Sequence, residues 1–267
     1  MKLTILGTGN ATVTRCYNTC FALHKGGDFL LVDAGGGNGI LRQLADAQLP
    51  LTRLHHLFLT HAHTDHLLGA VWIVRLVADA INKGKYEGEL TIWGHDLVLN
   101  VLEPLCRALL PAKFSRHFGV RIRFVELHPE DKLTCLGMEL TVFDILSTKA
   151  KQYGFRAVLP DGQVLTCLGD EPCNPACFGY ARGADWLLTE AFCLYEDREA
   201  FKPYEKHHST ALDGAKMAAE LGVKNLVLYH TEDKTIATRK VRYTAEAKSV
   251  FSGAVYVPND LDVIELA

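Results

Sequence analysis

One ten-residue segment constrains what this chain can be more than any other, because it crowds three histidines and an aspartate together. Residues 60–69 read THAHTDHLLG. In extended backbone, residues two apart point the same way, so His61, His63 and Asp65 can share a face, while His66 approaches from the next helix. In a chain of this composition the pattern arises by chance about once in 700 sequences. Imidazole and carboxylate groups at a strand-to-helix loop suit Zn²⁺ or a similar ion, so the segment predicts a metal site.

The rest of the sequence predicts a layered α/β protein. Short apolar, β-branched runs alternate with segments of helical spacing, and no linker, repeat or charge block divides the 267 residues. We therefore expect a single domain over residues 1–267. The expected strands are residues 3–7, 20–24, 29–33, 57–60, 90–93, 120–126, 139–145, 155–159, 164–168, 186–190, 225–229, 254–257 and 262–266, and the expected helices are residues 35–48, 67–82, 96–110, 210–221 and 245–251.

Composition narrows the class of protein. Lys and Arg number 28 against 31 Asp and Glu, and this near balance argues against a protein that coats nucleic acid through bulk charge. The eight cysteines are scattered through apolar runs, where a thiol behaves as a small buried hydrophobe. Residues 1–6 lack the apolar stretch of a signal peptide, and the most apolar window, residues 67–81, contains Arg75 and Asp79. We predict a cytoplasmic protein with reduced cysteines and no membrane association.

At the histidine-rich segment the sequence resembles the metallo-β-lactamase superfamily, whose fold is a four-layer αββα sandwich with a metal site at one edge. The run DAGGG, which begins at Asp33, resembles the family's second-strand aspartate and glycine turn, and it implies that Asp33 orients the metal loop. The string LGD, ending at Asp170, resembles the segment whose carboxylate bridges two metals. The string LYH, ending at His230, resembles the strand that carries the last histidine ligand.

The resemblance implies two metal positions. One would be held by His61, His63 and Asp170, and the other by Asp65, His66, Asp170 and His230. The implied ion is zinc or another divalent transition metal, with Mn, Fe and Ni as alternatives.

The sequence departs from the family pattern at Thr148. The family usually places a further histidine six residues before a Gly-aromatic pair, here Gly154-Phe155, and that position holds Thr148. A neutral hydroxyl is a poor replacement for imidazole, so we expect one firm metal site and a second that is weakened. Cys173 and Cys177 could supply thiolates, but the Asn-Pro-Ala between them favours a turn or a helix start.

Two further strings resemble the ribonuclease Z-like phosphodiesterases: TEAF, around Glu190, and HHSTA, around His208. In that branch the glutamate orients the histidine, which stabilises or protonates the leaving oxygen. A carboxylate raises the pKa of a neighbouring imidazole, so we expect His208 to serve as an acid near neutral pH. The alternative is a helix cap at Ser209 or Thr210 beside an incidental histidine.

We therefore predict a metal-dependent hydrolase, namely a phosphodiesterase in which a metal-bound hydroxide attacks phosphorus. Asp65 would hold and help deprotonate the water, and His208, oriented by Glu190, would assist the departing oxygen. Lys149 and Lys151 are candidates to attract an anionic substrate. The alternatives are a tRNA 3′-processing endonuclease, a sulfate, lactone or thioester hydrolase on the same fold, and a metal-binding or sensing protein with impaired catalysis.

The expected substrate is a small-molecule or nucleotide-like phosphodiester, and RNA is not favoured. Ribonuclease Z proteins carry a protruding arm that grips tRNA, whereas the sequence between Phe155 and Glu190 holds only a tight turn and about one short helix. Basic residues elsewhere could form patches, but such charges are usually solvated faces.

The expected partner is a second copy of the chain. Residues 67–77 read LLGAVWIVRLV, which is apolar nearly all round and more than one buried face requires. Related proteins often pair through a helix that follows the metal loop, so we predict a homodimer. The alternative is a helix covered by neighbouring loops.

Overall fold

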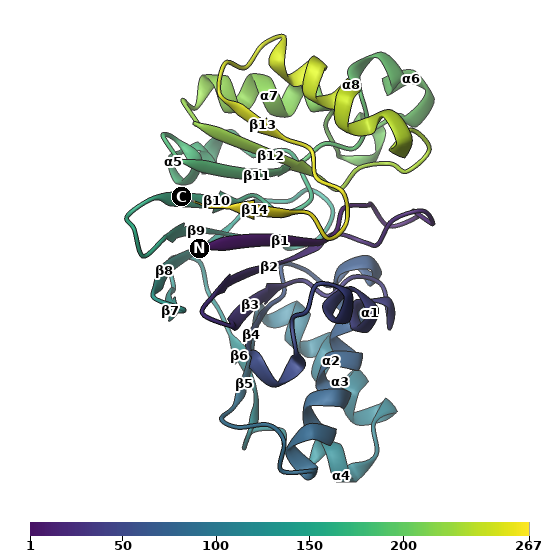
Figure 1. The fold of residues 1–267 in the computed structure, drawn as a ribbon, viewed down its shortest axis with the longest axis vertical. Helices are drawn as coiled ribbons and strands as arrows, with labels where there is room; N and C mark the ends of the chain where they lie inside the picture. Colours follow the sequence, from purple (N-terminus) through teal and green to yellow (C-terminus); the bar gives the residue numbers. More distant parts are fainter. Residues whose placement is uncertain (267) are drawn as a thin grey trace. The chain divides into compact units, whose positions relative to one another are not determined.

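The computed structural model describes residues 1–266, which form two compact units (Figure 1). The first unit contains residues 1–7, 17–128 and the chain from residue 260 onward, and the second contains residues 8–16 and 129–259. The backbone therefore passes from one unit to the other four times.

A seven-stranded sheet forms the centre of the first unit, in the order β14-β1-β2-β3-β4-β5-β6. The pairs from β14 to β3 are antiparallel, and those from β3 to β6 are parallel. The strands are β1 (Lys2–Gly7), β2 (Cys20–Lys25), β3 (Asp28–Val32), β4 (Leu54–Phe58), β5 (Leu90–Gly94), β6 (Ile122–Glu126) and β14 (Val263–Glu265). The helices are α1 (Gly39–Asp46), α2 (Thr64–Asn82), α3 (Asp96–Leu109) and α4 (Ala112–Ser115), with a 3₁₀ helix, η1 (Leu51–Arg53).

Helix α2 anchors the core of this unit. Its buried side chains Leu67, Val74 and Val77 join Leu57 of β4 and Ile92 of β5 in one apolar cluster. Complete burial of such side chains contributes about 1.5–3 kcal/mol each relative to exposure. The apolar spacing of residues 67–82 therefore holds the helix on the sheet and fixes its first turn beside the strand ends.

The parallel pairing of β3 and β4 decides where the histidine-rich segment lies. Val32 of β3 pairs with Phe58 of β4, and parallel neighbours end at the same edge of a sheet. Asp33 follows β3 at that edge and turns the chain with a φ of +56°. Gly69 of α2 lies against this turn, because a Cβ there would stand 1.8 Å from the carbonyl oxygen of Ala34. A glycine is thus required for the helix to approach so closely.

The second unit also has a seven-stranded sheet, in the order β13-β12-β11-β10-β9-β8-β7. The pairs from β7 to β10 are antiparallel, and those from β10 to β13 are parallel. The strands are β7 (Lys132–Cys135), β8 (Met138–Asp144), β9 (Tyr153–Val158), β10 (Val164–Cys167), β11 (Trp186–Glu190), β12 (Asn225–Tyr229) and β13 (Ala254–Tyr256). The helices are α5 (Phe178–Ala181), α6 (Arg198–Phe201), α7 (Ala211–Glu220) and α8 (Ile236–Lys248), with the 3₁₀ helices η2 (Pro175–Cys177), η3 (Tyr195–Asp197) and η4 (Tyr204–Lys206).

The parallel strands of the second unit bring three predicted site residues to one edge. Cys167 of β10 pairs with Leu188 of β11, and Glu190, the last residue of β11, pairs with Tyr229 of β12. Asp170 follows β10 and His230 follows β12. Because all three strands run the same way, these side chains leave the sheet at its carboxyl edge, where ligands usually bind in parallel sheets.

The predicted elements agree with the structure in kind, but several bounds differ: α1 starts at Gly39, α2 at Thr64 and β6 at Ile122, and the short helices α4 and α6 were not predicted. Strand β4 starts three residues before the predicted 57–60. Strand β7 was not predicted, because its alternation of Lys, Leu, Thr and Cys gives a weak apolar signal. Helix α8 runs over Ile236–Lys248 and not over 245–251, because its buried face consists of Arg239, Tyr243 and Ala247, and an arginine conceals the helical spacing.

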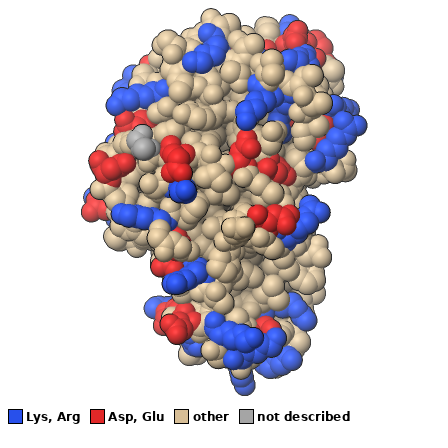
Figure 2. All heavy atoms as spheres, in the orientation of Figure 1, with Lys and Arg blue, Asp and Glu red and all other residues tan. Residues whose placement is uncertain are grey.

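Acidic and basic side chains share the surface. Figure 2 shows both kinds on the face that it draws, and several form exposed ion pairs, such as Lys2 with Glu265 at 2.9 Å and Arg242 with Glu196 at 2.6 Å. Exposed pairs of this kind contribute little to stability. Among residues 1–266, none of the helices combines the length and hydrophobicity that a membrane span requires.

Candidate active site

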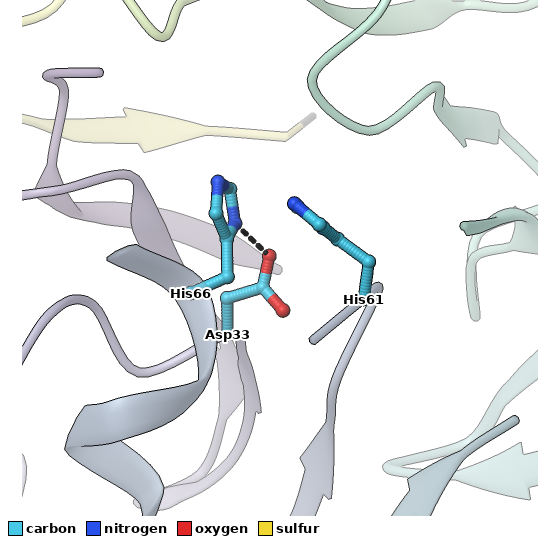
Figure 3. Close-up of side chains that lie close together, drawn as sticks. All are labelled: Asp33, His61 and His66. Atoms are coloured by element: carbon cyan, nitrogen blue, oxygen red, sulfur yellow. Dashed lines mark hydrogen bonds and ion pairs between the residues drawn. The ribbon is translucent and has the colours of Figure 1, made fainter. Parts of the chain in front are cut away.

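Asp33 organises the part of the site that lies in the first unit. One carboxylate oxygen, Oδ1, accepts a hydrogen bond of 2.8 Å from the Thr60 N–H, and Oδ2 accepts one of 2.8 Å from the Thr60 hydroxyl. Oδ2 also lies 2.7 Å from Nδ1 of His66, as the dashed line in Figure 3 marks. Asp33 therefore ties the ends of β3 and β4 to α2 and directs Nε2 of His66 as the nitrogen that a metal would contact. This agrees with the orienting role expected from the sequence.

Two more histidines converge on the same edge. Nε2 of His61 lies 2.8 Å from Nδ1 of His63, and the His61 ring lies 4.2 Å from the His66 ring between centroids. Nδ1 of His61 is 2.9 Å from the Thr60 hydroxyl. Ligand atoms of Asp33, His61 and His66 all lie within 4.8 Å of one another. Imidazole nitrogens this close together, beside a carboxylate, are a donor set that a zinc-like ion can use.

The start of α2 corrects one detail of the sequence argument. The helix begins at Thr64 with His63 as its N-cap, so Asp65 and His66 are consecutive residues of the first helical turn. The extended alternation holds for His61 and His63 but not for Asp65. Asp65 still meets the site, because its Oδ2 lies 3.4 Å from Nε2 of His66.

The charges around His66 favour a cation. Burial by itself lowers the pKa of this imidazole, but the carboxylates of Asp33 and Asp65 outweigh burial and raise it well above the ordinary value. The position between them is therefore one where positive charge is stabilised. Buried imidazole nitrogens beside carboxylates make a donor set that fits a divalent transition metal.

In the second unit, Gln152 holds Asp170. The Asp170 N–H donates to Oε1 of Gln152 at 2.9 Å, and Nε2 of Gln152 donates to Oδ1 of Asp170. The other carboxylate oxygen, Oδ2, lies 3.6 Å from Nε2 of His230. Gly169 makes room for this arrangement, because a Cβ there would stand 2.0 Å from Oε1 of Gln152. Asp170 and His230 thus face each other with the carboxylate fixed in one orientation.

Gln152 was missed from the sequence, and its role leads to a prediction. Replacing it by leucine should weaken metal binding by roughly 10- to 100-fold, the usual effect of losing a group that orients a ligand. Titration calorimetry of the metal-free protein with Zn²⁺ or Mn²⁺ measures this. The control is Gln163→Leu, which removes a glutamine that bonds Trp186 at 2.9 Å and should leave the affinity unchanged. Equal affinities in the two variants would contradict the role of Gln152.

Glu190 and His208 form the predicted pair. Glu190 is completely buried; its Oε1 accepts the Ser209 N–H at 2.6 Å and its Oε2 lies 3.6 Å from Nδ1 of His208. The His208 ring stacks on Phe192 at 4.9 Å and 19°. Thr210 caps α7 through a capping box. The helix cap and the Glu190–His208 contact therefore coexist and are not alternatives.

The protonation of this pair differs from the sequence expectation. Burial, the nearby His230 and the Lys149 ammonium lower the pKa of His208 to about 3, whereas the sequence argument expected a raised value. Burial also raises the pKa of Glu190 to about 8. Desolvation thus dominates, because it disfavours the charged form of each partner, and burial is not visible in the local sequence.

Thr148 and Lys149 lie next to this pair. The Thr148 hydroxyl is 2.6 Å from Nδ1 of His207, a histidine to which the sequence assigned no role. Nζ of Lys149 is 3.3 Å from Nε2 of His208. A cavity of about 340 Å³ opens here. We call it the Thr148 cavity; Leu146, Thr148, Glu171, Tyr204, His207 and His208 contribute to its wall.

Solved structures and curated proteins resemble the whole chain. The metallo-β-lactamase fold protein YhfI from Bacillus subtilis matches with a TM-score of 0.78 and 21% identity over 98% of each chain. The short form of human tRNase Z matches with a TM-score of 0.76 and 21% identity over the full length of both chains. The ribonuclease Z of Bradyrhizobium sp. (strain ORS 278) is 28% identical over 98% of each sequence.

Fold and donor set together define a metal-dependent hydrolase of the metallo-β-lactamase superfamily, of the ribonuclease Z-like kind, as the sequence predicted. Within it, the model of one family, described as Anti-Pycsar protein Apyc1, matches residues 1–156, more than half of the chain. The chain belongs to that family.

Proposed function

We propose that this hydrolase cleaves a small, nucleotide-like phosphodiester. The observation that carries the proposal is the pair of Glu190 and His208 beside the buried Asp170 and His230, because leaving-group assistance next to a ligand carboxylate suits phosphodiester cleavage. The family is described as an anti-Pycsar protein, and we propose that the chain opposes Pycsar through this hydrolysis.

We further propose the ligand set that the resemblance implied, for zinc or another divalent transition metal. The set consists of His61, His63, Asp65, His66, Asp170 and His230. Its support comes from each unit separately: converging imidazoles in the first, and the oriented Asp170 with His230 in the second. A bound divalent cation would supply Lewis-acid activation of water and offset the charge that develops on the phosphoryl group.

Different residues of the chain would then serve the attacking water and the departing oxygen. Asp65 accepts a proton from the attacking water through its carboxylate. Glu190 holds the His208 ring in position, and the departing oxygen would lie on the His208 side of the site. We propose that residues 1–267 work as one domain, because the backbone passes from one unit to the other four times.

Two arms of one experiment test the function. Purified protein is assayed with added Zn²⁺ or Mn²⁺ against small phosphodiesters, including nucleotide-derived ones, and against a tRNA precursor with a 3′ trailer. The proposal expects turnover of the small substrates. The second candidate, tRNA 3′ processing, is favoured by ribonuclease Z relatives such as the protein of Kineococcus radiotolerans, which is 25% identical over 98% of this chain. Cleavage of the precursor alone would replace our proposal with that candidate, and hydrolysis of sulfate, lactone or thioester panels alone would reject both.

Metal stoichiometry tests the weakened site. We expect elemental analysis to find about one tightly held transition metal per chain, because Thr148 offers only a hydroxyl. Thr148→His should raise the content toward two. The control is Thr134→His, a histidine added on the exposed side of β7. Unchanged stoichiometry and affinity in folded Thr148→His would show that position 148 does not face a metal.

We also propose a homodimer through α2. Trp72 is 38% exposed on this helix, and Leu68 and Leu76, one turn before and after it, are only half-buried. Light scattering at micromolar concentration should report a dimer for the wild type and a monomer for Trp72→Glu. Val241→Glu, at an exposed valine of α8, should stay dimeric. A monomeric wild type would reject this arrangement.

For the cellular location we propose the cytoplasm. All eight cysteines are free thiols in the structure, which is typical of proteins in reducing compartments.

A further inference from the structure

The side chain of Lys149 contacts the one ring that the proposed mechanism places at the leaving group. Its Nζ lies 3.3 Å from Nε2 of His208. The opposite ring nitrogen, Nδ1, lies 3.6 Å from Oε2 of Glu190. His208 is thus held between a carboxyl group and an ammonium group, and Phe192 stacks on its face.

The backbone that carries Lys149 is fixed by a buried carboxylate. Glu171 is 5% exposed. It accepts the Ser147 hydroxyl at 2.5 Å and the Thr148 N–H at 3.2 Å. The Ser147 Oγ in turn accepts the Lys149 N–H at 3.1 Å. Lys149 is therefore presented from a braced turn and not from a loose surface loop.

Hydrogen-bond chemistry assigns the protons in this contact. An ammonium group has three N–H donors and no acceptor. At the Lys149 contact, Nε2 of His208 must therefore be the acceptor, and a neutral imidazole then carries its proton on Nδ1, toward Glu190. In this tautomer Nε2 has no proton to give to a leaving oxygen. The group that presents N–H donors on this side of the ring is Lys149.

We propose that Lys149 is a catalytic residue that donates a proton from Nζ to the leaving oxygen, while His208 and Glu190 hold the ammonium group in place. This inference rests on the proposed phosphodiesterase function. As the P–O bond breaks, its electron pair stays on the leaving oxygen, which takes the Nζ proton and departs as an alcohol. Lys149, now a neutral amine on an exposed residue, regains a proton from solvent water.

Leaving-group dependence tests the role. Lys149→Met removes the charge at similar length, and it should lower kcat by about 10²-fold or more on a phosphodiester with a poor leaving group. On a nitrophenyl ester, which needs little protonation, the loss should be less than about tenfold. Lys149→Arg keeps the positive charge, but a guanidinium group is a weaker acid than an ammonium group. We therefore expect Lys149→Arg to recover part of the lost rate on the nitrophenyl ester and little of it on the poor leaving group. Equal recovery on both substrates would mean that only the charge matters.

The matched control is Lys224→Met. Lys224 is an exposed lysine whose Nζ lies 2.6 Å from Oδ1 of Asp185, and its loss should leave both substrates unaffected. An equal loss on both substrates in Lys149→Met, confined to KM, would overturn the proposal and make Lys149 a substrate anchor. No loss on either substrate would also overturn it.

A second measurement is independent of turnover. Nitrogen-15 NMR of the histidine rings at pH 7, in metal-free protein, should show His208 protonated at Nδ1, with an Nε2 signal that shifts in Lys149→Met. His208→Gln identifies the resonance. An Nε2–H tautomer in the wild type would overturn the proposal even if the protein hydrolysed no phosphodiester. Conversely, the expected tautomer in a protein without phosphodiesterase activity would reject the proposed function alone.

Discussion

Asp170→Ala should lose more metal than any other single substitution in the proposed ligand set, and its hydrolytic activity should fall to background. The carboxylate is the ligand expected to serve both metal positions. Gln152 holds its Oδ1, and Oδ2 faces His230 at 3.6 Å. Removing it takes away a ligand and also leaves Nε2 of Gln152 without its acceptor. Elemental analysis after gel filtration, together with a phosphodiesterase assay, measures both effects.

The control for this substitution is Asp161→Ala. Asp161 belongs to the turn between β9 and β10, where it accepts the Gln163 N–H at 3.1 Å. Its loss should leave metal content and rate unchanged. If Asp170→Ala kept the wild-type metal content while remaining folded by circular dichroism, Asp170 would not be a ligand.

His208→Ala should reduce the rate on a poor leaving group by roughly 10²–10⁴-fold, the range expected when the acid that serves the leaving oxygen is lost or displaced. The variant removes the ring that positions Lys149 and contacts Glu190. Metal content should change little, because His208 is outside the proposed ligand set. Steady-state kinetics on substrates of different leaving groups, with metal analysis of the same samples, check this.

His207→Ala separates the role of the His208 ring from that of the neighbouring His207. His207 is exposed and bonds the Thr148 hydroxyl at 2.6 Å, so its loss should cost far less activity. Full activity of His208→Ala on a poor leaving group would remove the Glu190–His208 pair from the mechanism.

The parts of the site that could be predicted all have a local sequence signature. His61, His63 and His66 are crowded into one short segment, and Asp170, Glu190 and His230 each stand at the end of an apolar run. Strand ends in parallel sheets share an edge, so such positions can be found one at a time.

The parts that were missed depend on distant packing. Gln152 meets Asp170 only because β9 pairs with β10, and Lys149 meets His208 across 59 positions of sequence. A glutamine or a lysine in a loop has no local sequence pattern that predicts such a distant contact. The direction of the His208 pKa shift was wrong for the same reason, since it depends on how deeply the folded chain buries the ring.

The pairing of β1 with β14 has a consequence for synthesis on the ribosome. Lys2 pairs with Glu265 and Thr4 with Val263, so one border of the first sheet stays open until β14, far along the chain, has been synthesised. During translation β1 presents unpaired N–H and C=O groups along that border, and exposed borders of this kind recruit strands from other chains. A chain cut just before β14 should therefore aggregate more readily than one that contains β14, although it retains every residue of the proposed site.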